Sequence, residues 1–153
     1  GGPAENFDTQ QRAGAFTETL IASGCTPDQH QVTFGQYTLE WGRQWALAAA
    51  SHHTLNGSGV LAGNDEIACG IMQVAEDSGV EIPRQLRVIG FDDTRLATLV
   101  RPRLSTVRVP MREVGAAAIR LLVQRVEDRT AEPTCIHLPT ALIIRESSVG
   151  PAQ

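Results

Sequence analysis

Four polar side chains stand where a ligand site could form, because of their types and their places along the chain. Tyr37, Asn64 and Asp92 each follow a run that is typical of a strand, and Arg12 lies about one helical turn past Asp8. In open α/β sheets the carboxyl ends of parallel strands meet at one edge, so we expect these side chains to lie together there. Carboxylates accept hydrogen bonds from hydroxyl groups, a guanidinium donates in a fork, and a tyrosine ring stacks on an apolar ring face. The set therefore suits a neutral polyhydroxylated or heteroaromatic small molecule.

Each of these residues also has a purely structural interpretation. Asn64 is a good helix cap, and Asp92-Asp93 is a typical strand-to-turn pair. An arginine on a helix, such as Arg12, is more often a solvated charge, and a residue such as Tyr37 more often packs against its neighbours. Their coincidence at one edge of one sheet favours a ligand site over four separate structural roles.

The residue inventory disfavours other kinds of chemistry. All 13 basic residues are arginine, and the absence of lysine removes Schiff-base chemistry, the phosphate-loop lysine and a lysine general base. The sequence has no nucleophile elbow, no phosphate loop and no dinucleotide-binding glycine pattern. His52 and His53 are adjacent, so they diverge on a helix, and no third ligand is spaced to join them. We therefore expect no enzyme activity, no metal and no cofactor.

The bulk composition is typical of a soluble globular domain. The chain has 153 residues, of which 42% are hydrophobic and 20% charged, enough for one compact core. Its net charge of -4 comes from scattered residues, so this piece alone should bind nucleic acid poorly. Cys25, Cys69 and Cys135 are odd in number and widely spaced, which favours unpaired core residues and a reducing, cytoplasmic compartment. No apolar run is long enough to span a membrane, so we expect no membrane partner.

The hydrophobic pattern alternates strands with helices. Helical spacing occurs at residues 8–23, where Asp8 could cap the start, and at residues 38–52 and 67–78. This order predicts an α/β fold with a parallel sheet covered on both faces. The strand-like runs that alternate with these helices lie at residues 31–35, 60–63 and 86–91. The remaining elements are a strand at 104–109, a long amphipathic helix at 112–129, and two final strands at 136–138 and 141–145.

Several motifs, taken together and in order, are specific. The two clearest are Gly-Asn-Asp-Glu-Ile-Ala-Cys-Gly at residues 63–70, and Gly-Val-Glu-Ile-Pro at 79–83 followed by Leu-Arg-Val-Ile-Gly-Phe-Asp-Asp at 86–93. The flanking motifs are Gly-Pro at 2–3, Arg-Ala-Gly-Ala-Phe at 12–16, Pro-Arg-Leu-Ser-Thr-Val at 102–107, Leu-Pro-Thr-Ala-Leu at 138–142 and Arg-Glu-Ser at 145–147. Over nearly its whole length the chain thereby resembles the lactose/galactose repressor (LacI/GalR) family of bacterial transcription regulators.

The resemblance implies a periplasmic-binding-protein-like (type I) fold, a three-layer α/β/α arrangement of which this chain holds mostly the C-terminal subdomain. Residues 1–106 would form that subdomain of the effector-binding domain. Residues 107–134 would be a crossover segment that completes the N-terminal subdomain, and residues 135–153 the return strands and C-terminal tail. The long helix would then lack its host sheet and need another partner, such as a second copy of the chain.

The resemblance also implies roles for single residues. Arg12 matches the arginine that grips the effector, Tyr37 the aromatic stacking position, and Asn64 the amide that follows a strand. Asp92 matches the carboxylate that accepts from hydroxyl groups, and Asp8 falls near a further polar contact.

Three positions depart from the family pattern. Gln36 stands where an acidic residue commonly precedes the aromatic one, and Ala15 where glycine is usual. Val109 stands where a glutamine often lines the cleft, which puts in doubt any effector that needs a polar contact there.

The function implied is the effector-sensing part of a homodimeric, DNA-binding regulator, most simply a repressor. It would bind a sugar or a nucleoside or purine, and would control operator DNA allosterically through an N-terminal domain that this chain lacks. The alternative is a periplasmic sugar-binding protein of a transport system, which shares the architecture. The pattern at residues 138–147 and the unpaired cysteines favour the regulator over the transport protein. An enzyme is the third interpretation, and the sequence offers too few catalytic residues for it.

Overall fold

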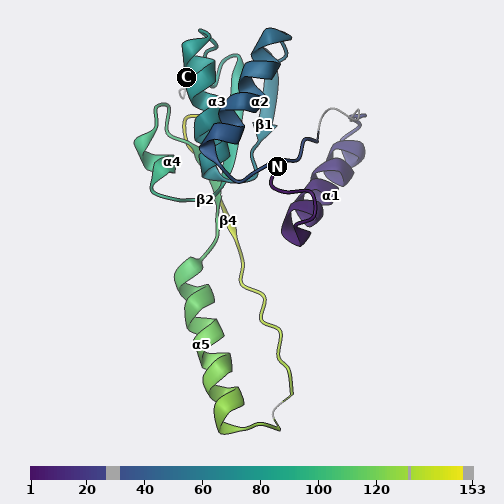
Figure 1. The fold of residues 1–153 in the computed structure, drawn as a ribbon, viewed down its shortest axis with the longest axis vertical. Coiled ribbons are helices and arrows are strands. Elements are labelled where there is room, and N and C mark those ends of the chain that lie inside the picture. The colour runs from purple at the N-terminus through teal and green to yellow at the C-terminus, as the bar shows by residue number, and fades with distance from the viewer. Residues whose placement is uncertain (27–31, 131, 150–153) are drawn as a thin grey trace.

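The computed structural model of the chain describes residues 1–26, 32–130 and 132–149. In these ranges helices and strands alternate along most of the chain, as the sequence predicts (Figure 1). The elements are α1 (Phe7–Ala22), α2 (Leu39–Ser51), β1 (Ser58–Leu61), α3 (Asp65–Asp77), β2 (Leu86–Asp92), α4 (Leu96–Leu99), β3 (Ser105–Arg108), α5 (Met111–Glu127) and β4 (Ala141–Ile143).

One four-stranded sheet organises the body of the molecule, and its strands lie in the order β1-β2-β3-β4. The first three strands are parallel, as predicted, which confirms the α/β class. The fourth strand is antiparallel to β3, because the chain leaves the body along β3, forms α5 and returns beside the strand on which it left. The sheet is therefore mostly parallel with one antiparallel edge.

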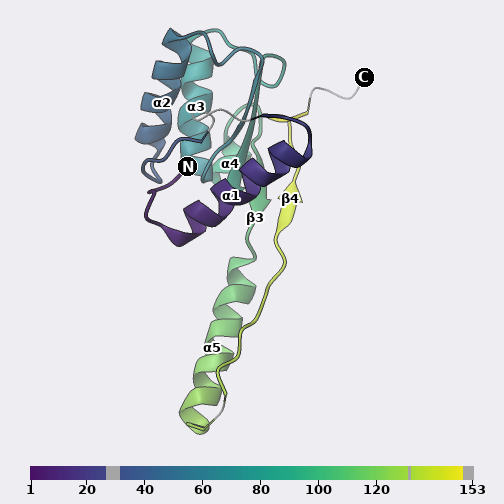
Figure 2. The same ribbon diagram turned by 90° about the vertical axis from the view of Figure 1, so that its right-hand side faces the viewer.

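Helices α2 and α3 form the layer that builds the core against one face of the sheet (Figure 2). Apolar side chains at helical spacing on α3, such as Ile67, Ile71 and Val74, are fully or almost fully buried against Leu86 and Val88 of β2. The two helices pack closely because small residues lie at their contact. A Cβ at Gly70 would overlap the backbone of α2, for example.

The second face of the sheet is more open than the prediction of helices on both faces implied. Helix α1 stands to one side of the sheet, apart from α2 and α3 (Figures 1 and 2). Leu61 of β1 alternates with the buried Ala62 and is 47% exposed, and Leu142 of β4 is 56% exposed. Among the described residues, α2 and α3 therefore cover one face of the sheet closely, whereas α1 lies on the other side and leaves part of the second face exposed.

Three local predictions are wrong. The first helix is capped by Asn6 instead of Asp8, since the Asn6 Oδ1 accepts from the Thr9 N–H at 2.9 Å. Residues 32–35 form no strand, because they lie beside the chain start, where the Gly35 N–H donates to the Gly2 carbonyl at 3.0 Å, and not beside a strand. Gln31, the first residue of that predicted strand, lies outside the described residues. Residues 136–138 also form no strand, because this return segment runs along α5 and has no neighbouring strand with which to pair.

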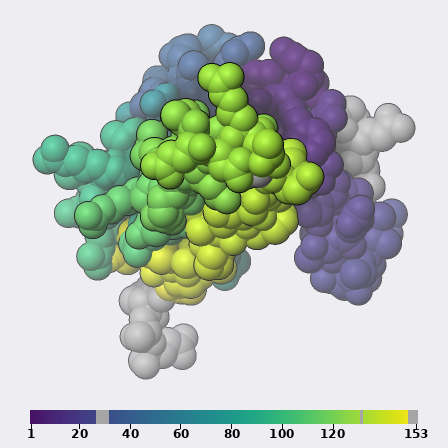
Figure 3. All heavy atoms as spheres, turned by 90° about the horizontal axis from the view of Figure 1, so that it is seen from below, coloured from purple at the N-terminus to yellow at the C-terminus, as the bar shows by residue number. Residues whose placement is uncertain are grey.

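We call α5 and the return segment, residues 111–140, the arm. The arm projects away from the body, and Figure 3, seen from below, shows it in front of the body. Its apolar side chains are largely uncovered: Ile119 is 60% exposed, Leu122 58% and Val126 71%. The expectation that the long helix lacks a partner within this chain agrees with this exposure.

The base of the arm is fixed in the sheet at the C-terminal end of the chain. The hydroxyl of the buried Ser147 donates to the Val88 carbonyl at 2.6 Å and accepts from the Ser105 N–H at 2.8 Å. The Ser147 carbonyl accepts from the Val88 N–H at 3.0 Å. The returning chain is thus hydrogen-bonded to both β2 and the start of β3. The strand that leads into the arm and the segment that follows it are therefore held together at Ser147.

The cysteine prediction is right for one residue of three. Cys69 on α3 is buried, whereas Cys25 and Cys135 are exposed because they lie outside the body's core, one after α1 and the other on the arm. All three are free thiols, as predicted. None of the helices in the described ranges is long and apolar enough to cross a membrane.

Candidate ligand-binding site

Arg12 is the centre of the predicted site. It lies on α1, and its guanidinium reaches across to the end of the sheet, where Nη1 donates to the Gly63 carbonyl at 2.7 Å. Its Nη2 donates to the Tyr37 hydroxyl at 2.5 Å. The same guanidinium lies 4.5 Å from the centre of the Phe91 ring and 5.7 Å from that of Tyr37, a cation–π arrangement. Arg12 therefore joins α1 to the ends of β1 and β2 and is not a solvated charge.

Tyr37 lies immediately before Thr38, whose side chain caps α2 by accepting from the Trp41 N–H. The Tyr37 hydroxyl lies 2.5 Å from the Thr9 Oγ1 as well as from the Arg12 guanidinium, so it connects two parts of α1 to the start of α2. The ring packs on Gly2, where a Cβ would overlap it. Tyr37 therefore does pack against its neighbours, and this packing holds its ring at the sheet edge where the ligand site is expected.

Asn64 is the N-cap of α3, and its Oδ1 accepts from the Ile67 N–H at 2.9 Å. Its Nδ2 donates to the Tyr37 carbonyl at 3.3 Å. The capping interpretation is therefore correct, and the same side chain also joins the starts of α2 and α3.

Asp92 ends β2 in a left-handed conformation, with φ of 99°, and its neighbour Asp93 has φ of 55°. Burial and then the charge of Asp65 raise the pKa of Asp92, while the charge of Arg12 opposes them. Asp92 is thus a half-buried carboxyl within the electrostatic reach of Arg12. Asp93 serves a different purpose, because it pairs with Arg108 and Arg145 at the base of the arm.

Hydrogen bonds join Arg12, Tyr37 and Asn64, and Asp92 lies close enough for the charge of Arg12 to influence its pKa. Asp8 is exposed, and its backbone carbonyl accepts from the Arg12 Nε at 3.2 Å, so its side chain has a weaker claim to the site.

Sequence reasoning missed Thr9 and Phe91, which complete the cluster. Thr9 is 4% exposed, and its hydroxyl lies between Asn6 and Tyr37. Its spacing of three from Asn6 is a helix-start signal that could have located it. Phe91 supplies the ring that lies against the Arg12 guanidinium. Its position next to the last residue of β2 is the sequence feature that could have located it.

The cluster offers donors, one carboxyl and two aromatic faces, a set that binds without reacting. No group of three histidine, cysteine, aspartate or glutamate side chains in the described part of the chain could hold a metal ion. A polar small molecule with hydroxyl groups and an apolar ring face is the ligand that this set fits.

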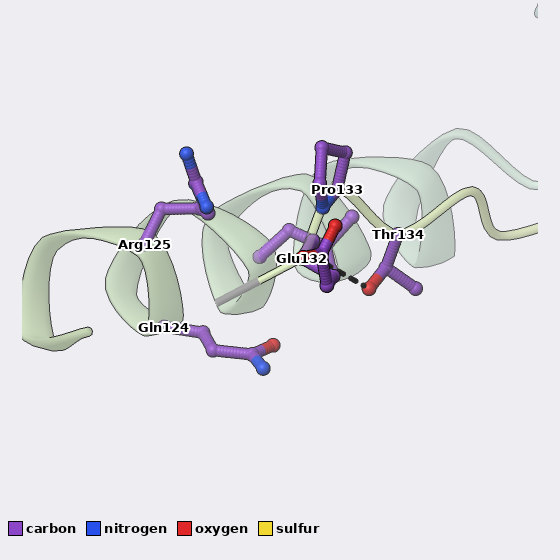
Figure 4. Close-up of a pocket in the computed structure, with 6 residues that line it drawn as sticks. Gln124, Arg125, Glu132, Pro133 and Thr134 are labelled. Atoms are coloured by element: carbon purple, nitrogen blue, oxygen red, sulfur yellow. Dashed lines mark hydrogen bonds between the residues drawn. The ribbon is translucent and has the colours of Figure 1, made fainter. Parts of the chain in front are cut away.

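A separate hollow of about 270 Å³ lies at the tip of the arm, between α5 and the return segment. Figure 4 shows Gln124 and Arg125 on one side of it and Glu132, Pro133 and Thr134 on the other. None of the predicted site residues lines it. Its walls are the end of α5 and the segment that returns beside this helix, away from the predicted site residues, so we assign it no part in the candidate site.

Comparison with known proteins agrees with this geometry. The family described as periplasmic binding protein-like domain matches residues 1–148. The catabolite control protein A of Priestia megaterium is 31% identical over 144 residues, which cover 94% of this chain and 43% of that protein. The transcriptional regulator GalR of Escherichia coli is 33% identical over 144 residues, covering 94% of this chain and 41% of the regulator.

Among solved structures, a complex of the transcriptional regulator CelR with cellobiose superimposes with a TM-score of 0.88 at 28% identity. The superposition covers 96% of this chain and 45% of that one. The chain thus spans less than half the length of the curated relatives and of the solved structure that it matches.

Proposed function

Because the chain belongs to the periplasmic binding protein-like domain family, in the branch whose members are LacI/GalR-type transcription regulators, we propose that it is the effector-sensing part of such a regulator. The observation that carries the proposal is the Arg12 cluster. A helix, two strand ends and two helix starts meet there around one guanidinium, at the sheet edge where α/β proteins bind ligands. The named relatives are regulators and not enzymes, which agrees with the lack of a catalytic motif.

We propose Arg12, Tyr37, Asn64 and Asp92 as the effector contacts, with Asp8 as a weaker fifth. Arg12 would donate to ligand oxygens and Asp92 would accept from ligand hydroxyl groups. Tyr37 would stack against an apolar ring face. Asn64 uses one Nδ2 hydrogen and one Oδ1 lone pair within the protein, so its second Nδ2 hydrogen or second Oδ1 lone pair would contact the ligand.

A sugar is the effector class that we favour, and a nucleoside or purine is the second. The presence of cellobiose in the CelR structure supports a sugar, since that regulator is 28% identical to this chain. A half-buried carboxyl beside a guanidinium suits neutral hydroxyl groups better than a phosphate, which Asp92 would repel. Val109 also disfavours an effector that needs a polar contact at that position.

We further propose that residues 1–106 are the C-terminal subdomain, residues 107–134 a crossover into an N-terminal subdomain, and residues 135–153 the return. The exposed apolar side chains of α5 support this division, because a helix with Leu122 and Val126 uncovered needs a partner surface. That surface would be the N-terminal subdomain or, failing that, a second copy of this chain.

In this proposal the effector closes the cleft between the two subdomains, and closure changes the spacing of two DNA-reading heads in a homodimer. Operator DNA would be contacted through an N-terminal domain outside this chain, in the cytoplasm. The coupling would be reciprocal, about 1–3 kcal/mol, so DNA and effector would alter each other's affinity by the same factor. A periplasmic sugar-binding protein remains the alternative, and the regulator names of the relatives weigh against it.

A thermal-shift screen of the complete protein against sugars, sugar phosphates, nucleosides and purines tests the proposal. An effector at about 100 times its dissociation constant should add about 2.7 kcal/mol to the unfolding free energy. The compound that shifts the protein most should also change its affinity for operator DNA. A protein that no compound in these classes stabilises would contradict the sensor role.

A further inference from the structure

Asp65, at the start of α3, is a buried carboxylate that the binding cluster does not use directly. Its side chain is fully buried, so it needs hydrogen-bond donors to offset the loss of water. Its Oδ2 accepts from the Thr94 N–H at 2.6 Å and from the Thr94 hydroxyl at 3.0 Å. Its Oδ1 accepts from the Thr106 hydroxyl at 2.6 Å. One carboxylate therefore binds both the segment that follows β2 and the middle of β3.

These donors surround the left-handed turn at Asp92 and Asp93. Left-handed backbone is costly for a residue with a Cβ and persists only where the surroundings hold it. Thr94 directly follows the turn and is bound to Asp65. The Asp93 N–H donates to the Thr106 hydroxyl oxygen at 3.3 Å, and that hydroxyl donates in turn to Asp65. Both ends of the turn are thus tied, one directly and one through Thr106, to the Asp65 carboxylate.

Asp65 also lies against β2 itself. A Cβ at Gly90 would overlap the Asp65 Oδ1, so the glycine is what lets the carboxylate approach the strand two residues before Asp92. Its charge is felt at Asp92, because burial and then Asp65 raise the pKa of the Asp92 carboxyl. Arg12 on α1 opposes this effect, and Arg108 of β3 is the register partner of Asp92. Asp65 therefore influences both the backbone and the electrostatics of the end of β2.

We propose that Asp65 is the positioning residue of this site: its buried carboxylate holds the turn that follows β2 and thereby sets the direction in which Asp92 faces the effector. Asp65 touches the turn and not the effector. The proposal rests on the proposed function, because the direction of Asp92 matters for binding only if Asp92 contacts the effector.

The test compares Asp65→Asn with Glu66→Gln in the complete protein. Both changes remove one negative charge from the first turn of α3 and keep the size of the side chain, but Glu66 is exposed. The asparagine retains one acceptor oxygen and cannot accept from Thr94 and Thr106 together. We expect hydrogen exchange of the Asp93 and Thr94 amides to accelerate by about 10- to 100-fold in Asp65→Asn, the effect of losing one hydrogen bond to a charged acceptor. Glu66→Gln should leave both amides unchanged.

A second readout follows the Asp92 carboxyl by ¹³C NMR. Its pKa should fall in Asp65→Asn, since the raising effect of the Asp65 charge is gone, and should stay in place in Glu66→Gln. If Asp65→Asn does not fold, Thr106→Val removes one hydroxyl of the same network at nearly constant volume. That variant should accelerate exchange at Asp93, and unchanged exchange there would overturn the proposal.

These readouts need no effector, so they separate this proposal from the proposed function. Unchanged amide exchange and an unchanged Asp92 pKa in folded Asp65→Asn would overturn the positioning role, whatever the complete protein binds. If the turn loosens, cellobiose and any other compound that stabilises the parent should bind Asp65→Asn about tenfold more weakly than Glu66→Gln. A loosened turn with equal affinities would also overturn the positioning role. A parent that binds none of the sugars, nucleosides or purines would contradict the proposed function alone.

Discussion

Neutralising Asp93 should weaken the base of the arm at neutral pH and have little effect in acid. The Asp93 side chain is 7% exposed and accepts from the Arg108 Nε at 2.6 Å and from the Arg145 Nη2 at 2.7 Å. Burial raises the pKa of Asp93, but the hydrogen bonds and charges of Arg108 and Arg145 outweigh burial and hold that pKa below its ordinary value. Asp93→Asn keeps the size of the side chain and removes the charge.

The two arginines should contribute unequally to this effect. Arg145 is 14% exposed, and breaking a buried pair costs about 3–5 kcal/mol. Because Arg145 also donates to the Leu104 carbonyl at 2.7 Å, we expect the lower end of that range, about 3 kcal/mol. Arg108 is 54% exposed, and such surface pairs contribute about 0–1 kcal/mol. Double-mutant cycles by urea denaturation should therefore give a larger coupling for Asp93 with Arg145 than with Arg108.

The pH dependence follows from the direction of the pKa shift. Since the folded pKa of Asp93 lies below its unfolded value of about 3.9, its contribution is present above that pH and is lost as the pH falls through the folded pKa. The unfolding free energies of the parent and Asp93→Asn should differ fully near pH 7 and converge as the pH falls through the lowered pKa of folded Asp93. A difference that stays constant over this range, or a coupling that is larger for Arg108, would refute the reasoning.

Three further predictions concern other parts of the chain. Arg12→Met should loosen α1, because it removes the hydrogen bonds to Gly63 and Tyr37 and the cation–π contacts that join the helix to the body. Amide exchange in α1, followed by mass spectrometry, should rise by on the order of 10- to 100-fold, and unchanged exchange would mean that other contacts hold the helix. Gly90→Ala should lower the unfolding free energy by about 1–3 kcal/mol in thermal denaturation, since its Cβ would overlap a buried carboxylate oxygen. Gly115→Ala on α5, where a Cβ meets open space, should instead raise the unfolding free energy by up to about 1 kcal/mol, so a loss at both positions would contradict the steric argument. Burial and the neighbouring acidic charges raise the pKa of Cys69 to about 11, so iodoacetamide near about pH 8 should alkylate the exposed Cys25 and spare Cys69. Mass spectrometry would identify the alkylated residue, and alkylation of Cys69 before Cys25 would contradict this prediction.

The sequence predicted the elements whose signals are local. Thr38 and Asn64 cap α2 and α3, as their residue types suggest, and the apolar spacing that follows them gives both helices nearly their full extent. The strand-like run at 86–91 likewise predicted β2 within one residue. A helix cap and a hydrophobic period depend only on residues that are close in the sequence, so a single sequence is enough to recognise them.

Two of the predictions that were wrong concern strands, whose formation depends on a neighbouring strand. Residues 32–35 and 136–138 both have strand-like composition, but a strand also needs a partner at hydrogen-bonding distance, which composition does not reveal. The antiparallel direction of β4 follows from the path of the arm and not from its own residues.

The candidate site was likewise predictable from the sequence only in part. Residue types and strand ends predicted that Arg12, Tyr37, Asn64 and Asp92 lie together; the structure joins the first three by hydrogen bonds, and their role as effector contacts stays a prediction. The buried hydrogen bonds of Asp65 were beyond reach, because an aspartate in the first turn of a helix is an ordinary feature and its bond to Thr106 joins residues 41 positions apart.

The most direct test of the effector site is the affinity of Asp92→Asn for the compound that most stabilises the complete protein. Isothermal titration should give an affinity about 10- to 100-fold weaker than that of the parent, because a hydrogen bond to a charged group contributes about 1.5–3 kcal/mol. Glu66→Gln, which removes an exposed charge nearby, should match the parent. Equal affinities of Asp92→Asn and the parent, with both proteins folded, would contradict the central claim that Asp92 and Arg12 lie in the effector site.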